Sequence, residues 1–557
     1  VIGVFFLALI GIIVWVVRQK QNDSADYFLG GRDATWLAIG ASIFASNIGS
    51  EHLIGLAGAG ASSGMAMAHW EIQGWMILIL GWVFVPFYSR SMVYTMPEFL
   101  ERRYNPQSRT ILSVISLVSY VLTKVAVTVY AGGLVFQQVF GIKELWGIDF
   151  FWIAAIGLVV LTALYTIFGG MKSVLYTSVL QTPILLLGSL IILVLGFKEL
   201  GGWDEMMRVC GAVTVNDYGD AMTNLIRSND DANFPWLGAL IGSAIIGFWY
   251  WCTDQFIVQR VLSGKNEKEA RRGTIFGAYL KLLPVFLFLI PGMIAFALHQ
   301  KYIGAGGEGF LPMLANGTAN ADAAFPTLVA KLLPAGVKGL VVCGILAALM
   351  SSLASLFNSS AMLFTIDFYK RFRPETPEKK LVGIGQIATV VIVILGILWI
   401  PIMRSVGDVL YTYLQDVQSV LAPGIAAAFL LGICWKRTSA QGGMWGLIAG
   451  MVIGLTRLGA KVYYSNAGEV ADSTFKYLFY DMNWLFFCGW MFLFCIIVVI
   501  VVSLATEAPT AEKIQGLVFG TATKEQKAAT RASWDHWDII HTAIILAITA
   551  AFYWYFW

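Results

Sequence analysis

The sequence predicts an all-α integral membrane protein with about 14 transmembrane helices, and three observations support this fold class. First, 58% of the 557 residues are hydrophobic and only 13% are charged. The mean hydropathy of +0.72 lies well above that of soluble globular proteins. Second, apolar runs of about 20 residues, the length that crosses a bilayer, recur along the whole chain. Third, Lys and Arg concentrate in alternate loops between these runs.

The candidate spanning segments have soft ends and mostly short connections. They are 1–18, 35–61, 66–89, 107–140, 150–170, 174–198, 235–260, 272–299, 336–369, 381–404, 408–433, 439–460, 479–506 and 536–557. The first opens on VIGVFFLALIGIIVWVV, without an initiator Met or a charged leading region. We therefore expect a truncated start within a first spanning helix rather than a signal peptide. The two longest connections, 199–234 and 300–335, are expected outside and hold turn-forming and polar residues.

Orientation follows from the basic residues. Most of the 37 Lys and Arg residues fall in the loop after the first segment and in every second loop after it. Such loops are cytoplasmic under the positive-inside rule, so the sequence predicts a multi-pass protein of the plasma (inner) membrane with both termini outside. The net charge of +3 is too small to indicate nucleic-acid binding.

Two spanning segments are interrupted by polar residues near mid-membrane: the second at Ala45–Glu51 and the seventh at Gly247–Gln255. They are five segments apart, which is typical of inverted-repeat secondary transporters with broken helices. We therefore expect a five-helix repeat at 35–198 and a second at 235–433. The segments at 1–18 and 439–557, one helix and three helices, are expected at the periphery.

Ionisable residues inside a membrane are costly and usually functional. Here they are Glu51, Glu71, Lys124, Asp254, Lys281 and Asp367. Glu71 could pair with Lys281 as a structural ion pair, or both could bind a ligand: a carboxylate accepts several hydrogen bonds and a Lys ammonium donates three.

Neutral polar and aromatic residues extend this set: Asn47, His52, His69, Gln73, Gln415, Trp70, Tyr250, Trp251 and Tyr411. Each alone has an ordinary explanation, either satisfying backbone groups freed by the break, joining helices, or packing in the core. Together, donors, acceptors and flat aromatic faces suit a neutral polyhydroxylated ligand such as a hexose.

Adjacent Ser351 and Ser352, in LAALMSSLASLFNS, place two hydroxyls near one helical turn. Hydroxyls in spanning helices often bond to their own backbone, so this signal is weak alone. Combined with the carbonyls of Ala45, Ile48 and Ala348, they give five uncharged oxygens, which suit a sodium ion. The sequence contains neither the G-x-x-x-x-G-K-[ST] motif of ATP-driven pumps nor HExxH, and its six Cys form no CxxC motif. We therefore expect no enzyme.

Five stretches, DYFLGGRDATWLAIGASIFASNIGSEHLIGLAG, WYWCTDQFIVQRVLS, GAYLKLLP, MSSLASLFNSSAMLFTIDFY and FLLGICWKR, resemble the sodium/glucose cotransporters of the sodium–solute symporter family. The resemblance runs from about Ala25 to Gly459. It implies a LeuT-type 5+5 inverted-repeat core with fourteen helices. The sugar contacts that it implies are Asn47, His52, Glu71, Tyr250, Trp251, Lys281 and Gln415, with Trp70 where the family often has Phe. Gln73 is a further candidate, from its place in the polar run.

The resemblance implies a sodium site at Ala45, Ile48, Ala348, Ser351 and Ser352, an inner gate at Tyr250 and an outer aromatic gate at Tyr411. Relatives that take two sodium ions have Thr and Asp where this chain has Ala354 and Ser178, so one sodium ion per sugar is expected. Glu51 and Thr412 also depart from the animal members, which leaves the sugar open but not the class.

The resulting hypothesis is an electrogenic sodium-coupled symporter of a glucose- or galactose-type hexose, working by alternating access in a lipid bilayer. Within the family, myo-inositol or another solute is an alternative. A sugar sensor or sugar-gated channel without stoichiometric transport is another. The oligomeric state stays open.

Overall fold

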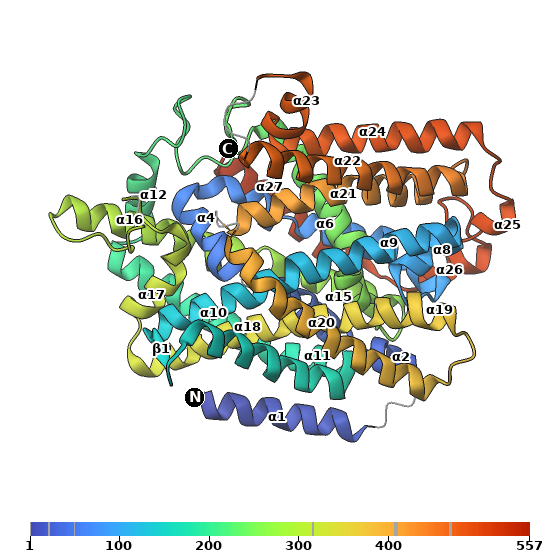
Figure 1. Cartoon of the computed structure of the whole chain (residues 1–557), viewed down its shortest axis with the longest axis horizontal. Helices are drawn as coiled ribbons and strands as arrows, with labels where there is room; N and C mark the ends of the chain where they lie inside the picture. The colour runs from blue at the N-terminus through green and yellow to red at the C-terminus, as the bar shows by residue number, and fades with distance from the viewer. Residues whose placement is uncertain (1, 20–22, 50, 315–316, 406–409, 467–470) are drawn as a thin grey trace.

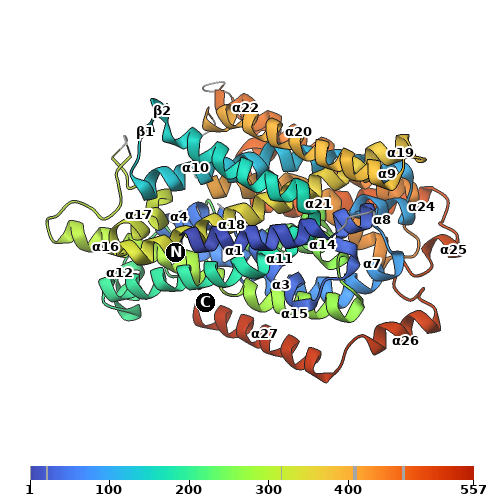
Figure 2. The same cartoon turned by 90° about the horizontal axis from the view of Figure 1, so that it is seen from below.

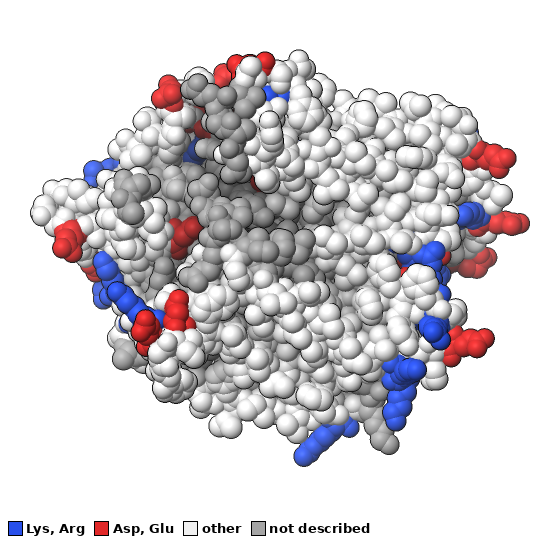
Figure 3. All heavy atoms as spheres, viewed as in Figure 1, with Lys and Arg blue, Asp and Glu red and all other residues white. Residues whose placement is uncertain are grey.

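The computed structural model describes the chain except residues 1, 20–22, 50, 315–316, 406–409 and 467–470. Its long helices run along one common axis in both ribbon views (Figures 1 and 2). Figure 3 shows acidic and basic side chains gathered toward the two ends of that axis, with an uncharged band between them on this face. The membrane normal therefore lies along the long axis, since uncharged surface faces lipid.

The first part of the chain starts with an apolar helix and continues into a helix that breaks at mid-length. Its elements are α1 (Ile2–Arg18), α2 (Ser24–Leu29), η1 (Gly30–Arg32), α3 (Trp36–Asn47), η2 (Glu51–Leu56), α4 (Ala57–Ser62), η3 (Gly64–Met67), α5 (Ala68–Glu71), α6 (Gly74–Ile79), η4 (Leu80–Phe84), α7 (Val85–Ser91) and α8 (Met96–Arg103).

The next part holds a long run of helix preceded by a short hairpin. Its elements are α9 (Pro106–Ser119), η5 (Tyr120–Val125), α10 (Ala126–Phe140), β1 (Glu144–Leu145), β2 (Ile148–Asp149), α11 (Phe150–Leu200) and α12 (Trp203–Gly211). Strands β1 and β2 pair antiparallel. The segments predicted at 150–170 and 174–198 both fall in α11, whose backbone turns at Gly170 with φ 53° and ψ −151°. That conformation suits glycine, and it separates the two segments.

The second half repeats the pattern of an interrupted helix followed by long helices. Its elements are α13 (Trp236–Gly247), η6 (Phe248–Thr253), α14 (Gln255–Leu262), α15 (Glu267–Lys281), η7 (Val285–Leu289), α16 (Ile290–Gly304), η8 (Ala321–Ala323), α17 (Ala324–Leu332), α18 (Ala335–Met362), η9 (Leu363–Tyr369), α19 (Lys370–Phe372), α20 (Glu378–Ser405) and α21 (Leu410–Cys434).

The last part adds three long helices and short connecting ones. They are α22 (Ala440–Asn466), α23 (Thr474–Lys476), η10 (Tyr477–Asp481), α24 (Trp484–Ala505), α25 (Ala511–Ile514), α26 (Lys524–Ala532) and α27 (His536–Tyr555). Helix α24 packs against α13, α21 and α22, whereas α27 packs against α6 and α15.

Ten helices in the described part of the chain are long and apolar enough to cross a membrane, and α1, α3 and the helix over Ala126–Gln137 are apolar but shorter. The count of fourteen and the division into two repeats stay predictions. In both ribbon views α1 starts and α27 ends toward the same end of the long axis (Figures 1 and 2). Which side of the membrane that end faces also stays a prediction.

The predicted interruptions are present in the backbone. Helix α3 ends at Asn47, Ile48 is extended with φ −80° and ψ 104°, and a π-helical turn, η2, begins at Glu51. In the second case a π-helical turn, η6, ends at Asp254, which is extended with φ −77° and ψ 127°. The Asp254 carboxylate then caps α14 by accepting from the backbone N–H of Phe256.

Helix α3 lies in the centre of the molecule, packed against α11, α15 and α18. Its contact with α15 runs through glycines: a Cβ on Gly40 would lie 2.4 Å from Phe276, and a Cβ on Gly273 would lie 2.6 Å from Ile39. Small residues allow two spanning helices to approach this closely, where dispersion contacts rather than exclusion of water stabilise packing. The interruption of α3 is therefore buried in protein, where non-helical backbone is tolerated at membrane depth.

Candidate functional site

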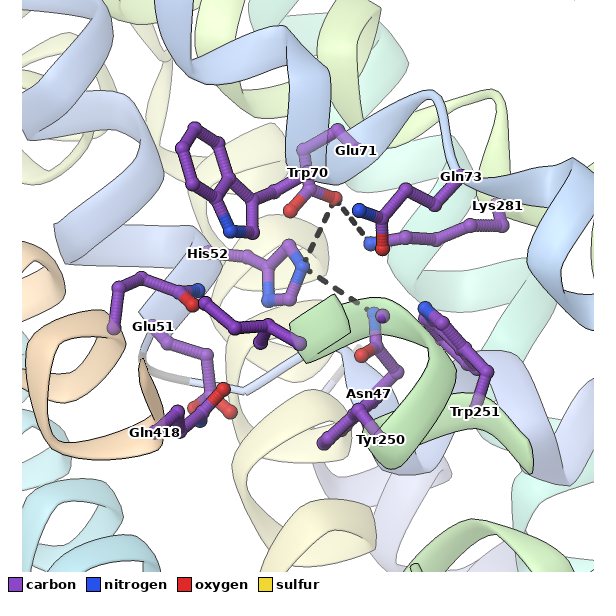
Figure 4. Close-up of a pocket in the computed structure, with 13 residues that line it drawn as sticks. Asn47, Glu51, His52, Trp70, Glu71, Gln73, Tyr250, Trp251, Lys281 and Gln418 are labelled. Atoms are coloured by element: carbon purple, nitrogen blue, oxygen red, sulfur yellow. Dashed lines mark hydrogen bonds and ion pairs between the residues drawn. The ribbon is translucent and has the colours of Figure 1, made fainter. Parts of the chain in front are cut away.

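A cavity lies beside the interruption of α3 and encloses about 420 Å³ of space not filled by protein atoms. Thirteen residues line it: Asn47, Glu51, His52, Trp70, Glu71, Gln73, Ile246, Gly247, Tyr250, Trp251, Lys281, Gln415 and Gln418. Figure 4 shows most of them pointing toward a common space. The structure thus brings together all nine residues predicted from the sequence to contact a substrate.

An ion pair sits at one side of the cavity. The Nζ atom of Lys281, at the end of α15, donates to Oε2 of Glu71, at the end of α5, over 2.5 Å. Both side chains are buried, so each charge depends on the other for compensation. The pair therefore fits the structural alternative raised by the sequence, and both residues also line the cavity.

His52 lies against the same carboxylate. Its Nε2 is 3.2 Å from Oε2 of Glu71 and 3.3 Å from Nδ2 of Asn47. An ionised carboxylate only accepts, so the contact with Glu71 assigns a ring proton to Nε2, and Nε2 then cannot accept from the Asn47 amide nitrogen. The other ring nitrogen, Nδ1, is then an acceptor in the neutral imidazole, and it has no hydrogen-bond partner among the described residues.

Two further buried polar atoms in the lining are also without a partner in the described part of the chain. They are Nε1 of Trp70, a donor only, and Oε1 of Gln415, an acceptor. An unpaired buried polar group costs about 1–3 kcal/mol. Three such atoms around one cavity, of both donor and acceptor type, indicate a place for a ligand that carries both donors and acceptors.

Aromatic faces form the remaining walls. Tyr250 and Trp251, both on η6, meet edge to face with ring centroids 4.9 Å apart. Lys281 Nζ lies 5.3 Å from the ring centroid of Trp251, a cation–π distance. Trp70 stacks on Trp484 of α24, with centroids 5.5 Å apart and ring planes inclined by 24°. Trp484 could not be predicted from the sequence, because nothing local links α24 to α5.

Gln73 is held by the backbone of α13. Its Nε2 donates to the carbonyl of Ser243 over 2.8 Å. Its Oε1 lies over Gly247, where an added Cβ would come within 2.4 Å of it. Glycine at position 247 therefore leaves the space that this amide occupies, and a larger residue would require the amide to move. Gln418 also lines the cavity but was not predicted from the sequence. It follows Gln415 by three residues and so lies on the same face of the helix.

Tyr411, the predicted outer gate, falls at the start of α21, but its side chain lies outside the described residues. Its role stays a prediction. His69 precedes Trp70 and is fixed at both ring nitrogens: Nε2 donates to the carbonyl of Leu225 over 3.1 Å, so Nδ1 accepts from the Tyr553 hydroxyl over 3.0 Å. The end of α27 is thereby attached next to the site.

The predicted sodium ligands, Ala45, Ile48, Ala348, Ser351 and Ser352, are all buried. They come from the interrupted end of α3 and from α18, which pack together. The point where a Cβ of Gly49 would stand is 3.1 Å from Oγ of Ser352, so the break lies directly against α18. Carbonyl and hydroxyl oxygens are the donors that a small hard cation prefers. As ligands these five residues stay a prediction.

Ser178 and Ala354 occupy the two positions where relatives that take two sodium ions have Asp and Thr, and neither residue has a carboxylate. Oγ of Ser178 donates to the carbonyl of Val174 over 2.6 Å and lies 3.2 Å from Oγ of Ser351. Ala354 is buried and has no polar side chain. In the described part of the chain, no group of three or more His, Cys, Asp and Glu side chains is arranged to hold a metal ion.

Lys124 and Asp254 form a second buried ion pair, with Nζ and Oδ2 2.7 Å apart. Asp254 also accepts from the hydroxyl of Tyr120. The Lys124 ammonium lies 4.6 Å from the ring centroid of Tyr250, a cation–π distance, so this pair packs against one wall residue of the cavity.

The sequence matches the model of the sodium:solute symporter family over residues 27–450. It is 36% identical over 535 residues to human sodium/myo-inositol cotransporter 2, covering 94% of this chain and 78% of the relative. It is 35% identical over 551 residues to sodium/glucose cotransporter 4 of Danio rerio, covering 96% and 82%. The structure superposes on a substrate-bound, outward-open Na⁺-coupled sialic acid symporter with a TM-score of 0.72 at 22% identity, covering 91% and 98%. The predicted all-α membrane fold of LeuT type is confirmed.

Proposed function

The chain belongs to the sodium:solute symporter family, and from this membership we propose that it couples sodium entry to uptake of a glucose- or galactose-type hexose. Sodium is the coupled ion of this family. We further propose one sodium ion per sugar, because Ser178 and Ala354 stand where a second ion would need an acidic and a hydroxyl ligand.

One observation carries the choice of a neutral polyhydroxylated solute: the three unpartnered polar atoms of His52, Trp70 and Gln415 around one cavity. The hydroxyls of a sugar ring can donate to Nδ1 of His52 and to Oε1 of Gln415. Another hydroxyl can accept from Nε1 of Trp70 at the same time. The charges of Glu71 and Lys281 offset each other, so the solute needs no net charge. Trp251 and Tyr250 supply the flat apolar surface on which the carbon face of a pyranose rests.

The coupling follows from the position of the two sites on either side of one break. Sodium bound between α3 and α18 would fix Asn47 and His52, which lie at the ends of the same interruption and line the cavity. A site formed in this way binds solute better with the ion than without it, and the solute in turn raises the affinity for the ion. A membrane potential adds about 2.3 kcal/mol per charge per 100 mV to the inward movement.

Myo-inositol is the second candidate. Relatives that resemble the chain at 36–37% identity are named sodium/myo-inositol cotransporters in several mammals. This cyclitol is also a neutral six-membered ring with hydroxyls all round, so the unpartnered atoms of the cavity suit it equally. It differs in lacking a ring oxygen and an exocyclic hydroxymethyl group.

Uptake into proteoliposomes separates these solutes. Radiolabelled D-glucose, D-galactose and myo-inositol would be offered to the full chain with an inward sodium gradient and, as the control, with an equal potassium gradient. We expect accumulation above equilibrium of at least one of them with sodium only. Sodium current without accumulation of any of the three solutes would contradict symport and favour a solute-gated channel.

A further inference from the structure

Glu51 is a second carboxylate at the cavity. It begins η2, directly after the interruption of α3, and its side chain is partly exposed. Figure 4 shows it beside Gln418, on the other side of the cavity from Glu71 and Lys281. Glu71 pairs with Lys281 over 2.5 Å, but Glu51 has no cationic side chain within 4.0 Å among the described residues.

The backbone of Gly49 places this carboxylate next to the proposed sodium site. A Cβ added to Gly49 would lie 2.8 Å from Oε2 of Glu51 and 3.1 Å from Oγ of Ser352. Both oxygens therefore face the same point and are less than about 6 Å apart. Oxygen ligands lie about 2.4 Å from a cation of this size, so two oxygens about 5 Å apart can share one ion.

The cationic side chains near Glu51 form their direct ion pairs with other carboxylates. Lys124 and Lys281 both interact electrostatically with Glu51. However, Lys124 already donates to Asp254 and Lys281 already donates to Glu71. Arg260 has Tyr250 and Asp254 as its electrostatic neighbours. Among the described residues Glu51 therefore has long-range attraction from these cations but no direct ion pair, and its carboxylate oxygens can coordinate a mobile cation.

We propose that the carboxylate of Glu51 is an anionic ligand of the coupling sodium ion, added to the uncharged oxygens of the break and of α18. The inference rests on the sodium site of the proposed function and deepens it. At about 5 Å and an effective dielectric constant of about 20, the attraction of a full charge corresponds to a few hundredfold in ion affinity. Because desolvation of the carboxylate offsets part of this, we expect an effect of ten- to a hundredfold. Because Glu51 also lines the cavity, an ion that holds it neutralises a charge facing the solute before a neutral solute enters.

The test measures ion binding without any solute. Equilibrium binding of ²²Na⁺ to the purified full chain would be compared among wild type, Glu51→Gln, Glu51→Asp, Ser352→Ala and Asp367→Asn. The last variant is the matched control, because it also removes a buried carboxylate, one that pairs with Arg109 at the far end of the same helical run as Ser352. Size-exclusion profiles and thermal unfolding show whether each variant is folded.

We expect Glu51→Gln to weaken sodium binding ten- to a hundredfold, Glu51→Asp by about two- to fivefold because the charge is kept but moved back by one methylene group, and Asp367→Asn not at all. A folded Glu51→Gln protein that binds ²²Na⁺ with wild-type affinity overturns the proposal. If in addition its half-saturating solute concentration rises, Glu51 is a solute contact instead. Wild-type ²²Na⁺ binding by Ser352→Ala would refute the sodium site itself, which is a separate failure. Should the glutamine variant not fold, a drop in affinity with Glu51→Asp of less than twofold would overturn it as well.

Discussion

Trp70 of the substrate cavity stacks on Trp484, a residue more than four hundred positions later in the chain, with ring centroids 5.5 Å apart. Helix α24, expected at the periphery, therefore supplies the outer support of a cavity wall. Trp484 is itself buried, and the next residue, Leu485, packs onto Gly238 and Gly242 of α13, which keeps the start of α24 close to the broken helix.

Replacing Trp484 with alanine should loosen Trp70. A stacked aromatic pair contributes about 0.5–1.5 kcal/mol beyond its buried area, so we expect the half-saturating solute concentration to rise about two- to tenfold. Uptake kinetics in proteoliposomes, with D-glucose or myo-inositol according to which is transported, measure this. Trp490→Ala is the control, since Trp490 is 62% exposed on the same helix. Equal effects of the two variants would argue against the wall role.

Gly247→Ala should displace the amide of Gln73, because the new Cβ would stand 2.4 Å from its Oε1. Either the amide turns and loses its bond to Ser243, or α13 shifts. We expect solute affinity to fall at least about tenfold while ²²Na⁺ binding is kept, because the loss of a buried hydrogen bond costs about 1–3 kcal/mol. Gly157→Ala is the matched control, since a Cβ there meets no atom within 4 Å. Unchanged solute affinity in Gly247→Ala would contradict the contact.

The pair of Glu71 and Lys281 can be separated into a structural and a ligand role by a double substitution. Lys281→Gln alone leaves a buried unpaired carboxylate, so we expect a large loss of thermal stability, of about 3–5 kcal/mol, and no uptake. Adding Glu71→Gln should restore most of the stability, because both charges are then gone. If the double variant also recovered wild-type uptake, neither side chain would be a ligand contact.

Ser352→Ala should abolish sodium-driven uptake, since it removes one of two hydroxyls facing the break. The same change at Ser360 is the control: this residue is buried on α18 two turns later, and its hydroxyl has no partner among the described residues. We expect Ser360→Ala to keep the sodium dependence of uptake. Intact sodium-driven accumulation in Ser352→Ala would refute the assigned ion site.

Tyr553→Phe tests whether the end of α27 supports the site. It removes the hydroxyl that donates to Nδ1 of His69 and leaves a buried acceptor unpaired, at a cost of about 1–3 kcal/mol. We expect a lower unfolding temperature, with at most a several-fold change in solute affinity. Tyr555→Phe is the control, since Tyr555 is exposed and accepts only from Trp203. Equal unfolding temperatures of the two variants would exclude the support.

The class of fold and the interruption of α3 were predictable because both depend on short stretches of consecutive residues. Hydropathy marks a spanning segment, and a polar run such as Asn47 to His52 cannot face lipid. The cavity lining was predictable through resemblance, since isolated polar residues in a membrane have several meanings. The roles of Glu51, Trp484 and Gly247 were not predictable, because each depends on an approach between elements far apart in sequence: Ser352, Trp70 and Gln73 respectively.

The glycine contact between α3 and α15 has a mechanical consequence. Gly40 of α3 packs against Phe276 of α15, and Gly273 of α15 packs against Ile39 of α3. These close contacts on both sides resist sliding of one helix along the other. Bending at the break would then carry α15, and with it Lys281, along with α3. The two helices would then move as one rigid unit that pivots at the interruption after Asn47.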